Sequence, residues 1–173
     1  DAHRGVDEVV MAFQGGEPTL MGIDFFRRTL ALEQQIAAPG QRVLNTLQTN
    51  ATLIDDEWAV FLAENGFLVG VSIDGPRDLH DAYRVDKGGK PTFDRVMAGL
   101  DVLRRHDVEW NALTTVHAAN GDHGREVYTF LRDDLGARFV QLIPIVEREG
   151  ERGVTDRSVG ADQYGRFLVE VFD

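Results

Sequence analysis

Cysteine is absent from this 173-residue sequence. Without thiols these residues form no disulfide and hold no thiolate-bound metal or iron–sulfur cluster. Long apolar runs are missing too: the longest are strand-sized, well short of the roughly 20 residues that a membrane-spanning helix needs. No basic segment followed by an apolar one opens the chain as a signal peptide would. Together these absences predict a cytoplasmic protein without a membrane partner.

Positive charge is scarce, with 18 Lys and Arg against 29 Asp and Glu and a formal net charge of −11. No basic run is available to neutralise phosphates, so we expect no nucleic-acid partner. The acidic surplus is typical of a solvated surface. Hydrophobic residues make up 43% of the chain, enough at this length for one sizeable core and one domain.

Five runs of apolar or β-branched residues are nearly continuous, which is typical of strands buried on both faces. They cover Val9 to Phe13, Val43 to Gln48, Phe67 to Ile73, Trp110 to Val116 and Phe139 to Ile145. Helical periods lie between them, the clearest formed by Phe93, Val96, Met97, Leu100 and Leu103 with Thr92 as the expected cap. This strict alternation predicts a parallel sheet with helical crossovers, either curled into a barrel or open.

Polar residues gather where the predicted strands end, the edge at which parallel α/β folds build their sites. The first three strands are followed by Gln14-Gly15-Gly16-Glu17-Pro18, Gln48-Thr49-Asn50 and Ser72-Ile73-Asp74-Gly75-Pro76. Adjacent glycines let the backbone approach a ligand closely. We infer a pocket for a zwitterion, with Glu17 for an ammonium group, Ser72 and Arg84 for a carboxylate, and amides for hydroxyls or a base.

Several of these residues also have purely structural interpretations. Glu17 is able to cap the following helix, and Asp74-Gly75-Pro76 is a competent turn without any ligand. Arg84 is nearly as well suited to a surface ion pair with Asp81 or Asp86.

Histidines offer a weaker case for chemistry. His80 and Asp81 are more typical of a helix terminus than of a metal or acid–base pair. No zinc spacing, phosphate loop or nucleophile motif is present. One alternative function is nevertheless a barrel lyase or isomerase, in which Glu17 and His117 would be the acid–base pair.

Read in order, the motifs after the strands, together with His80-Asp81-Ala82-Tyr83-Arg84, resemble the radical S-adenosylmethionine (SAM) superfamily. Three longer segments are similar to anaerobic sulfatase-maturating enzymes: 14–22, 84–93 and 139–148. The resemblance covers nearly the whole chain. It implies an α/β fold, a partial (β/α)6 radical SAM barrel of parallel strands with outer helices that lacks the first strand and the cluster loop. Residues 1–173 would be the central part of that domain, cut at both ends, with the last helix leading to a C-terminal auxiliary-cluster domain.

The resemblance also assigns roles to the edge residues. Gln14 would face the peptide substrate and is the candidate catalytic residue. Gly15, Gly16 and Glu17 would hold the amino group of SAM. The other candidate cofactor-binding residues would be Ser72 and Arg84 at its carboxylate, Ile143 and Ile145 near its adenine, and the amides of Gln48 and Asn50. Ala51 stands where glycine is common in the family.

The implied activity is that of a radical SAM oxidoreductase. In the family, a reduced [4Fe-4S] cluster cleaves SAM, and the resulting 5'-deoxyadenosyl radical begins the oxidation of a sulfatase cysteine or serine to Cα-formylglycine, with an electron donor as a further partner. The cluster cysteines are missing here, so we expect this segment alone to be inactive. The alternatives are a radical SAM/SPASM enzyme acting on another peptide, and a cluster-less module that binds SAM or a peptide.

Overall fold

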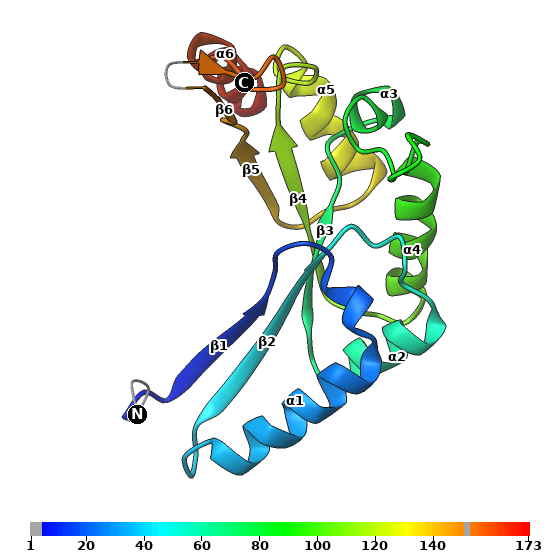
Figure 1. Ribbon diagram of the computed structural model, residues 1–173, viewed down its shortest axis with the longest axis vertical. Coiled ribbons are helices and arrows are strands. Elements are labelled where there is room, and N and C mark those ends of the chain that lie inside the picture. Colours follow the sequence, from blue (N-terminus) through cyan, green and yellow to red (C-terminus); the bar gives the residue numbers. More distant parts are fainter. Residues whose placement is uncertain (1–4, 151–152) are drawn as a thin grey trace. The chain divides into compact units, whose positions relative to one another are not determined.

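The computed structural model describes residues 5–150 and 153–173, and the chain forms two compact units. One contains Asp1–Val71 and Met97–Trp110, and the other contains Ser72–Val96 and Asn111–Asp173. Strands and helices alternate along the chain (Figure 1). The five main strands are hydrogen-bonded in the order β1-β2-β3-β4-β5, which confirms the predicted α/β class.

The first unit is built on three parallel strands. Strand β1 (Glu8–Phe13) pairs with β2 (Arg42–Thr49), which pairs with β3 (Leu68–Ser72). The connections contain the short 3₁₀ helix η1 (Pro18–Met21), helix α1 (Ile23–Ile36) and helix α2 (Asp56–Glu64). Most of helix α4 (Phe93–Arg105) also belongs to this unit.

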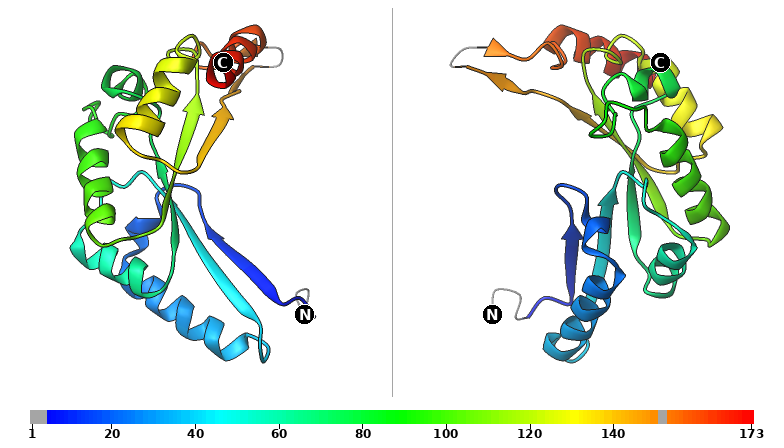
Figure 2. Two further views of the ribbon diagram at one scale, coloured as in Figure 1. Left: turned by 180° about the vertical axis from the view of Figure 1, so that it is seen from behind. Right: turned by 45° about the vertical axis from the view of Figure 1, so that its right-hand side comes forward.

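An aromatic cluster forms the core of the first unit. Phe26 on α1 is completely buried, and Figure 2 shows this helix running alongside β1 and β2. Its ring centroid lies 5.0 Å from Phe13, 5.4 Å from Trp58 and 6.2 Å from Phe67, all in edge-on geometry. Such pairs add to the stabilisation from burial alone, so this ring holds α1 against the strands.

The second unit contains the parallel pair β4 (Trp110–Val116) and β5 (Val140–Pro144). Its other elements are α3 (Arg77–Asp81), α5 (Gly124–Thr129), the π-helix η2 (Phe130–Asp134), the hairpin strands β6 (Arg148–Glu149) and β7 (Gly153–Val154), and α6 (Ala161–Phe172). Helices α5 and α6 lie side by side (Figures 1 and 2). Val127, Leu131 and Phe167 are buried in this unit. The backbone N–H of Ile73 donates to the carbonyl of Leu113 at 3.0 Å, which joins the end of β3 to β4.

The five predicted strands and the helix predicted from Phe93 to Leu103 are confirmed with small shifts at their ends. Thr92 directly precedes α4, and its carbonyl accepts the backbone N–H groups of Arg95 and Val96 at 3.0 Å, but its hydroxyl is not the capping acceptor. The Thr92 hydroxyl donates to the carbonyl of Arg84 at 2.6 Å, while Asp81 Oδ1 accepts the backbone N–H groups of Thr92 and Phe93, both at 2.9 Å. No helix in the described part of the chain combines the length and apolar character of a bilayer span.

Two glycines provide a matched test of this packing. A Cβ built on Gly99 in α4 would lie 2.1 Å from the backbone oxygen of Ala51, whereas one on Gly165 in α6 meets no atom within 4 Å. Because a backbone oxygen cannot move aside easily, Gly99→Ala is expected to lower the free energy of unfolding by about 3 kcal/mol. Gly165→Ala should raise it by about 0.5 kcal/mol through helix propensity. Urea unfolding of both variants checks the prediction, and similar changes in the two would contradict it.

Candidate functional site

In the first unit, the side chain of Glu17, in the loop after β1, is hydrogen-bonded to the end of β2. Its Oε1 accepts hydrogen bonds from the Thr19 backbone N–H at 3.1 Å, the Thr19 hydroxyl at 2.6 Å and the Thr49 hydroxyl at 2.8 Å. Its Oε2 accepts only the backbone N–H of Asn50, at 2.8 Å, among the described residues. The capping interpretation of Glu17 is therefore correct for η1, and Oε2 still has acceptor capacity for a ligand.

The two glycines before Glu17 adopt conformations that favour glycine. Gly15 has φ 96° and Gly16 has φ 58°, and a Cβ on either would meet no atom within 4 Å. Since both residues are exposed, their backbone groups are accessible from solvent. This arrangement suits the close approach of a ligand to the main chain.

The amide side chains of this unit differ in their exposure and in which of their hydrogen-bonding groups have no partner among the described residues. Gln14 is exposed, and Gln48 is partly buried. The side-chain oxygen Oδ1 of Asn50 accepts hydrogen bonds from the Thr52 backbone N–H at 3.0 Å and from the Thr52 hydroxyl at 2.7 Å. Only the NH₂ group of Asn50 therefore lacks a partner among the described residues, so its predicted role is restricted to that of a donor.

Ala51 has φ 57°, in the left-handed region that suits glycine. A side chain in this region costs roughly 1 kcal/mol. The position at which the sequence departs from the family pattern is therefore one where the backbone itself favours glycine.

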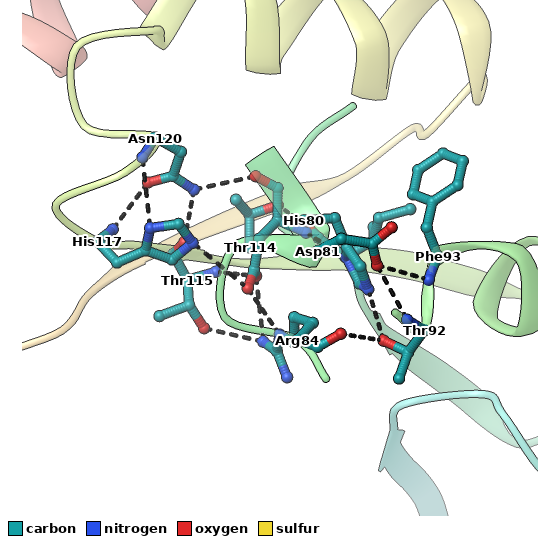
Figure 3. Close-up of polar contacts among 11 residues, drawn as sticks. His80, Asp81, Arg84, Thr92, Phe93, Thr114, Thr115, His117 and Asn120 are labelled. Carbon is teal, nitrogen blue, oxygen red and sulfur yellow. Dashed lines mark hydrogen bonds and ion pairs between the residues drawn. The ribbon is translucent and has the colours of Figure 1, made fainter. Parts of the chain in front are cut away.

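In the second unit, Asp74 is the centre of a buried polar network. Its partners Arg84, Thr115 and Asn120 are labelled in Figure 3. Its side chain is 2% exposed and binds Arg84 through two contacts, Oδ2 to Nε at 2.6 Å and Oδ1 to Nη2 at 3.1 Å. Oδ1 also accepts the backbone N–H of Thr115 at 2.8 Å, and the Thr115 hydroxyl accepts from Arg84 Nη2 at 3.0 Å. Asn120 donates to the Asp74 carbonyl at 2.9 Å.

The predicted surface pair of Arg84 with Asp81 or Asp86 is wrong, because Asp74 binds the guanidinium instead. Asp81 is engaged by the first turn of α4. Asp86 accepts the backbone N–H groups of Gly88 at 2.9 Å and Lys90 at 3.0 Å, which lowers the pKa of its carboxyl group. Arg84 remains 30% exposed, and its Nη1 has no partner among the described residues.

The helix-terminus prediction for His80 and Asp81 is confirmed, since His80 lies in the last turn of α3 and Asp81 accepts the first backbone N–H groups of α4. His80 is also completely buried. Its Nδ1 accepts the Asp74 backbone N–H at 3.3 Å, and its Nε2 lies 3.1 Å from the Thr92 hydroxyl. Because that hydroxyl donates its proton to Arg84 O, Nε2 is the protonated nitrogen of His80 and donates to Thr92. Burial lowers the pKa of His80 to about 4, with Asp74 acting in the opposite direction.

This burial makes the stability of the chain depend on pH. The unfolded chain takes up a proton on His80 near pH 6.5 and the folded chain only near pH 4. The stabilisation is therefore complete above about pH 6.5 and decreases as the pH falls toward 4, by about 3 kcal/mol in total. Urea unfolding across that range should show a smaller pH slope for His80→Gln than for the native chain. The exposed control His123→Gln should keep the native slope, and an unchanged slope in His80→Gln would contradict the prediction.

His117 is also buried, at 1% exposure, and burial lowers its pKa. The Tyr83 ring packs edge-on against it with centroids 4.6 Å apart. Its Nδ1 accepts the Asn120 backbone N–H at 3.3 Å, so the ring is fixed rather than presented to a ligand. This environment disfavours the lyase or isomerase alternative, which needs an accessible His117.

The remaining predicted cofactor residues lie at strand ends of the second unit. Ser72 is partly buried at the end of β3, and its hydroxyl has no partner among the described residues. Ile143 in β5 is 40% exposed, and Ile145 follows that strand with its backbone N–H donating to the Val116 carbonyl at 2.8 Å. The apolar side chains and the free hydroxyl are compatible with the predicted adenine and carboxylate contacts.

No group of three or more His, Asp or Glu side chains in the described residues is arranged to hold a metal ion. The chain contains no cysteine either. The described residues therefore do not fit an iron–sulfur cluster.

Comparison with known proteins places this geometry in context. The family described as the radical SAM superfamily matches residues 2–131. The chain belongs to the radical SAM superfamily. A serine-type anaerobic sulfatase-maturating enzyme of Bacteroides thetaiotaomicron is 39% identical over 181 residues, covering 96% of this chain and 43% of that protein. A cysteine-type enzyme of Clostridium novyi is 39% identical over 163 residues, covering 94% of the chain and 43% of that protein.

Solved structures agree with this membership. The structure titled native anSMEcpe with bound AdoMet and Kp18Cys peptide is similar to this radical SAM chain, with a TM-score of 0.88 and 36% sequence identity. The match covers 99% of this chain and 47% of the anSMEcpe chain. The chain therefore has the predicted partial radical SAM barrel fold. It spans less than half the length of each of these relatives.

Sequence reasoning missed the role of Asp74 in this radical SAM chain. An aspartate directly after a buried strand and before Gly75-Pro76 was interpreted as a turn residue. Its contacts with Thr115, which is 41 positions away, depend on tertiary structure and leave no periodic pattern. The one available signal was an acidic residue placed immediately beside apolar Ile73.

Proposed function

We propose that this chain is the central, SAM-binding part of a longer radical SAM enzyme that oxidises a sulfatase cysteine or serine to Cα-formylglycine. The observation that carries the proposal is the match, over nearly the whole chain, to sulfatase-maturating enzymes in sequence and to anSMEcpe with bound AdoMet and peptide in structure. Relatives of both the serine type and the cysteine type are about equally similar, so the proposal includes both target residues.

The first unit is suited to bind the amino group of SAM. Glu17 keeps acceptor capacity at Oε2, and the exposed backbone of Gly15 and Gly16 leaves room for a ligand. An ammonium group needs several acceptors with negative charge nearby. We expect Gln48 and the Asn50 NH₂ to contribute further polar contacts.

The second unit is suited to bind the carboxylate and the adenine. Arg84 Nη1 and the Ser72 hydroxyl are donors without partners among the described residues. The apolar side chains of Ile143 and Ile145 suit the face of an aromatic base. A ligand with an ammonium, a carboxylate and a base therefore matches the donor and acceptor types that the chain offers.

When bound and reductively cleaved, SAM would supply a carbon radical able to remove a hydrogen atom from Cβ of the target residue. The part of this chain in that reaction is to bind the cofactor, orient it and exclude water around it, since an unprotected radical attacks whatever lies close. Gln14, exposed at the end of β1, would face the peptide. The cluster cysteines and a low-potential electron donor are expected from outside these residues, and this chemistry suits a reducing cytoplasm.

The full-length protein tests the proposal after expression without oxygen and reconstitution with iron and sulfide. We expect it to form 5'-deoxyadenosine together with an aldehyde in a sulfatase peptide that contains the target cysteine or serine. An alanine at the target position serves as the peptide control. Formation of 5'-deoxyadenosine without change in either target peptide would contradict the sulfatase assignment, and failure to bind SAM would contradict the cofactor assignment.

A further inference from the structure

Asp74 is a buried charge whose bonding the SAM contacts proposed above do not explain. Its side chain is 2% exposed, and an ionised carboxylate at such a position is costly unless it is paired and hydrogen-bonded. Three donors satisfy it: Nε and Nη2 of Arg84 and the backbone N–H of Thr115. Its position is therefore determined by both the chain segment after β3 and the end of β4.

The backbone of Asp74 is also hydrogen-bonded. Its backbone N–H donates to His80, and its carbonyl accepts from Asn120. The Nε2 of His117 lies 3.8 Å from Oδ2, too far for a hydrogen bond. Because His117 Nδ1 accepts a backbone N–H, its proton is on Nε2 and faces the carboxylate. Asp74 thus has little freedom to move.

Arg84 is consequently fixed by two of its three guanidinium nitrogens. Nε and Nη2 bind Asp74, and Nη2 also binds the Thr115 hydroxyl at 3.0 Å. Nη1 remains the nitrogen without a partner among the described residues. A guanidinium is a planar fork, so fixing one edge determines the direction of the remaining N–H groups.

We propose that Asp74 is a positioning residue for SAM recognition, holding the Arg84 guanidinium so that Nη1 is preorganised to bind the SAM carboxylate. This inference rests on the proposed function. Asp74 also offsets the charge of Arg84, so its benefit is orientation rather than attraction. A mobile arginine loses rotamer entropy on binding that is worth up to about 30-fold in affinity, and preorganisation avoids that loss.

The test compares SAM with its carboxylate-free analogue, decarboxylated SAM, by equilibrium dialysis against the reconstituted full-length enzyme. Asp74→Asn is expected to weaken SAM binding about 10- to 30-fold while changing the affinity for decarboxylated SAM by less than about twofold. The KM for SAM should rise in parallel with little change in kcat for SAM cleavage. A merely structural role would weaken both ligands equally.

Two further variants complete the test. Asp94→Asn is the matched control, because Asp94 binds Arg77 through two contacts but is 78% exposed, and it should leave both affinities unchanged. Thr115→Val keeps the inference testable if Asp74→Asn fails to fold. It removes one contact to Arg84 and keeps the backbone N–H to Asp74, so it should weaken the binding of SAM a few-fold, again more than that of decarboxylated SAM. Equal weakening of both ligands, or unchanged SAM affinity, overturns this inference alone. A native enzyme that does not bind SAM overturns the proposed function as well.

Discussion

Glu17→Gln in the full-length enzyme is expected to reduce SAM affinity by about 100-fold, or about 3 kcal/mol. The carboxylate accepts four hydrogen bonds from three residues, Thr19, Thr49 and Asn50. A glutamine keeps one acceptor oxygen but places an NH₂ group against a donor, either the Asn50 backbone N–H or the threonine groups. The loop after β1 then loses a hydrogen bond, and the ammonium group of SAM loses its anionic partner. Equilibrium dialysis with labelled SAM measures the effect.

The control for this prediction is Glu64→Gln. Glu64 ends α2 in the same unit and is exposed, with no partner among the described residues. The same change in charge should therefore leave SAM affinity within about twofold. Native-like SAM binding in Glu17→Gln would show that the carboxylate serves only as the cap of η1.

Phe26→Ala is expected to lower the free energy of unfolding of the chain by about 4 kcal/mol. The Phe26 ring is completely buried. It contacts five other aromatic residues, with centroids between 5.0 and 6.5 Å away: Phe13, Phe25, Trp58, Phe61 and Phe67. Truncation removes the free energy gained by burying the ring. It also leaves a cavity, because the rigid aromatic neighbours cannot move in to fill it.

Urea unfolding measures this loss, and the same helix provides the control. Ile36 ends α1 and is 80% exposed, so Ile36→Ala should change the free energy of unfolding by less than about 0.5 kcal/mol. If the two variants lose similar stability, the aromatic cluster is not the core of this unit.

The secondary structure was predictable because its signals are local. Val9 to Phe13 and Trp110 to Val116 are apolar runs of strand length, and both form strands. The helical period from Phe93 to Leu103 likewise forms α4. By contrast, the hairpin of β6 and β7 has strands of two residues each, too short to produce an alternating pattern.

The polar site was predictable in its location but not in its pairing. The ends of β1, β2 and β3 were identified as the functional edge because parallel strands expose their following loops there. Which donor meets which acceptor depends on tertiary contacts. Arg84 lies close in sequence to Asp81 and Asp86 yet binds Asp74, ten positions earlier, because β4 supplies Thr115 to complete that arrangement.

Histidine placement shows the same dependence on tertiary structure. The sequence favours a helix terminus for His80, which lies in the last turn of α3, and offers His117 only as a member of an acid–base pair. Both are buried, each accepting a backbone N–H at Nδ1. A histidine whose ring nitrogens are hydrogen-bonded or enclosed can lie in a protein core. A single sequence carries no signal that distinguishes such a buried histidine from an exposed histidine.

The central claim is that this chain binds SAM. An anaerobic crystal structure of the full-length protein with SAM is the most direct test. We predict that the amino group contacts Glu17 Oε2 and the Gly15-Gly16 backbone, while the carboxylate contacts Arg84 Nη1 and Ser72. SAM bound with its carboxylate away from Arg84, or with its amino group away from Glu17 and the two glycines, would contradict the account.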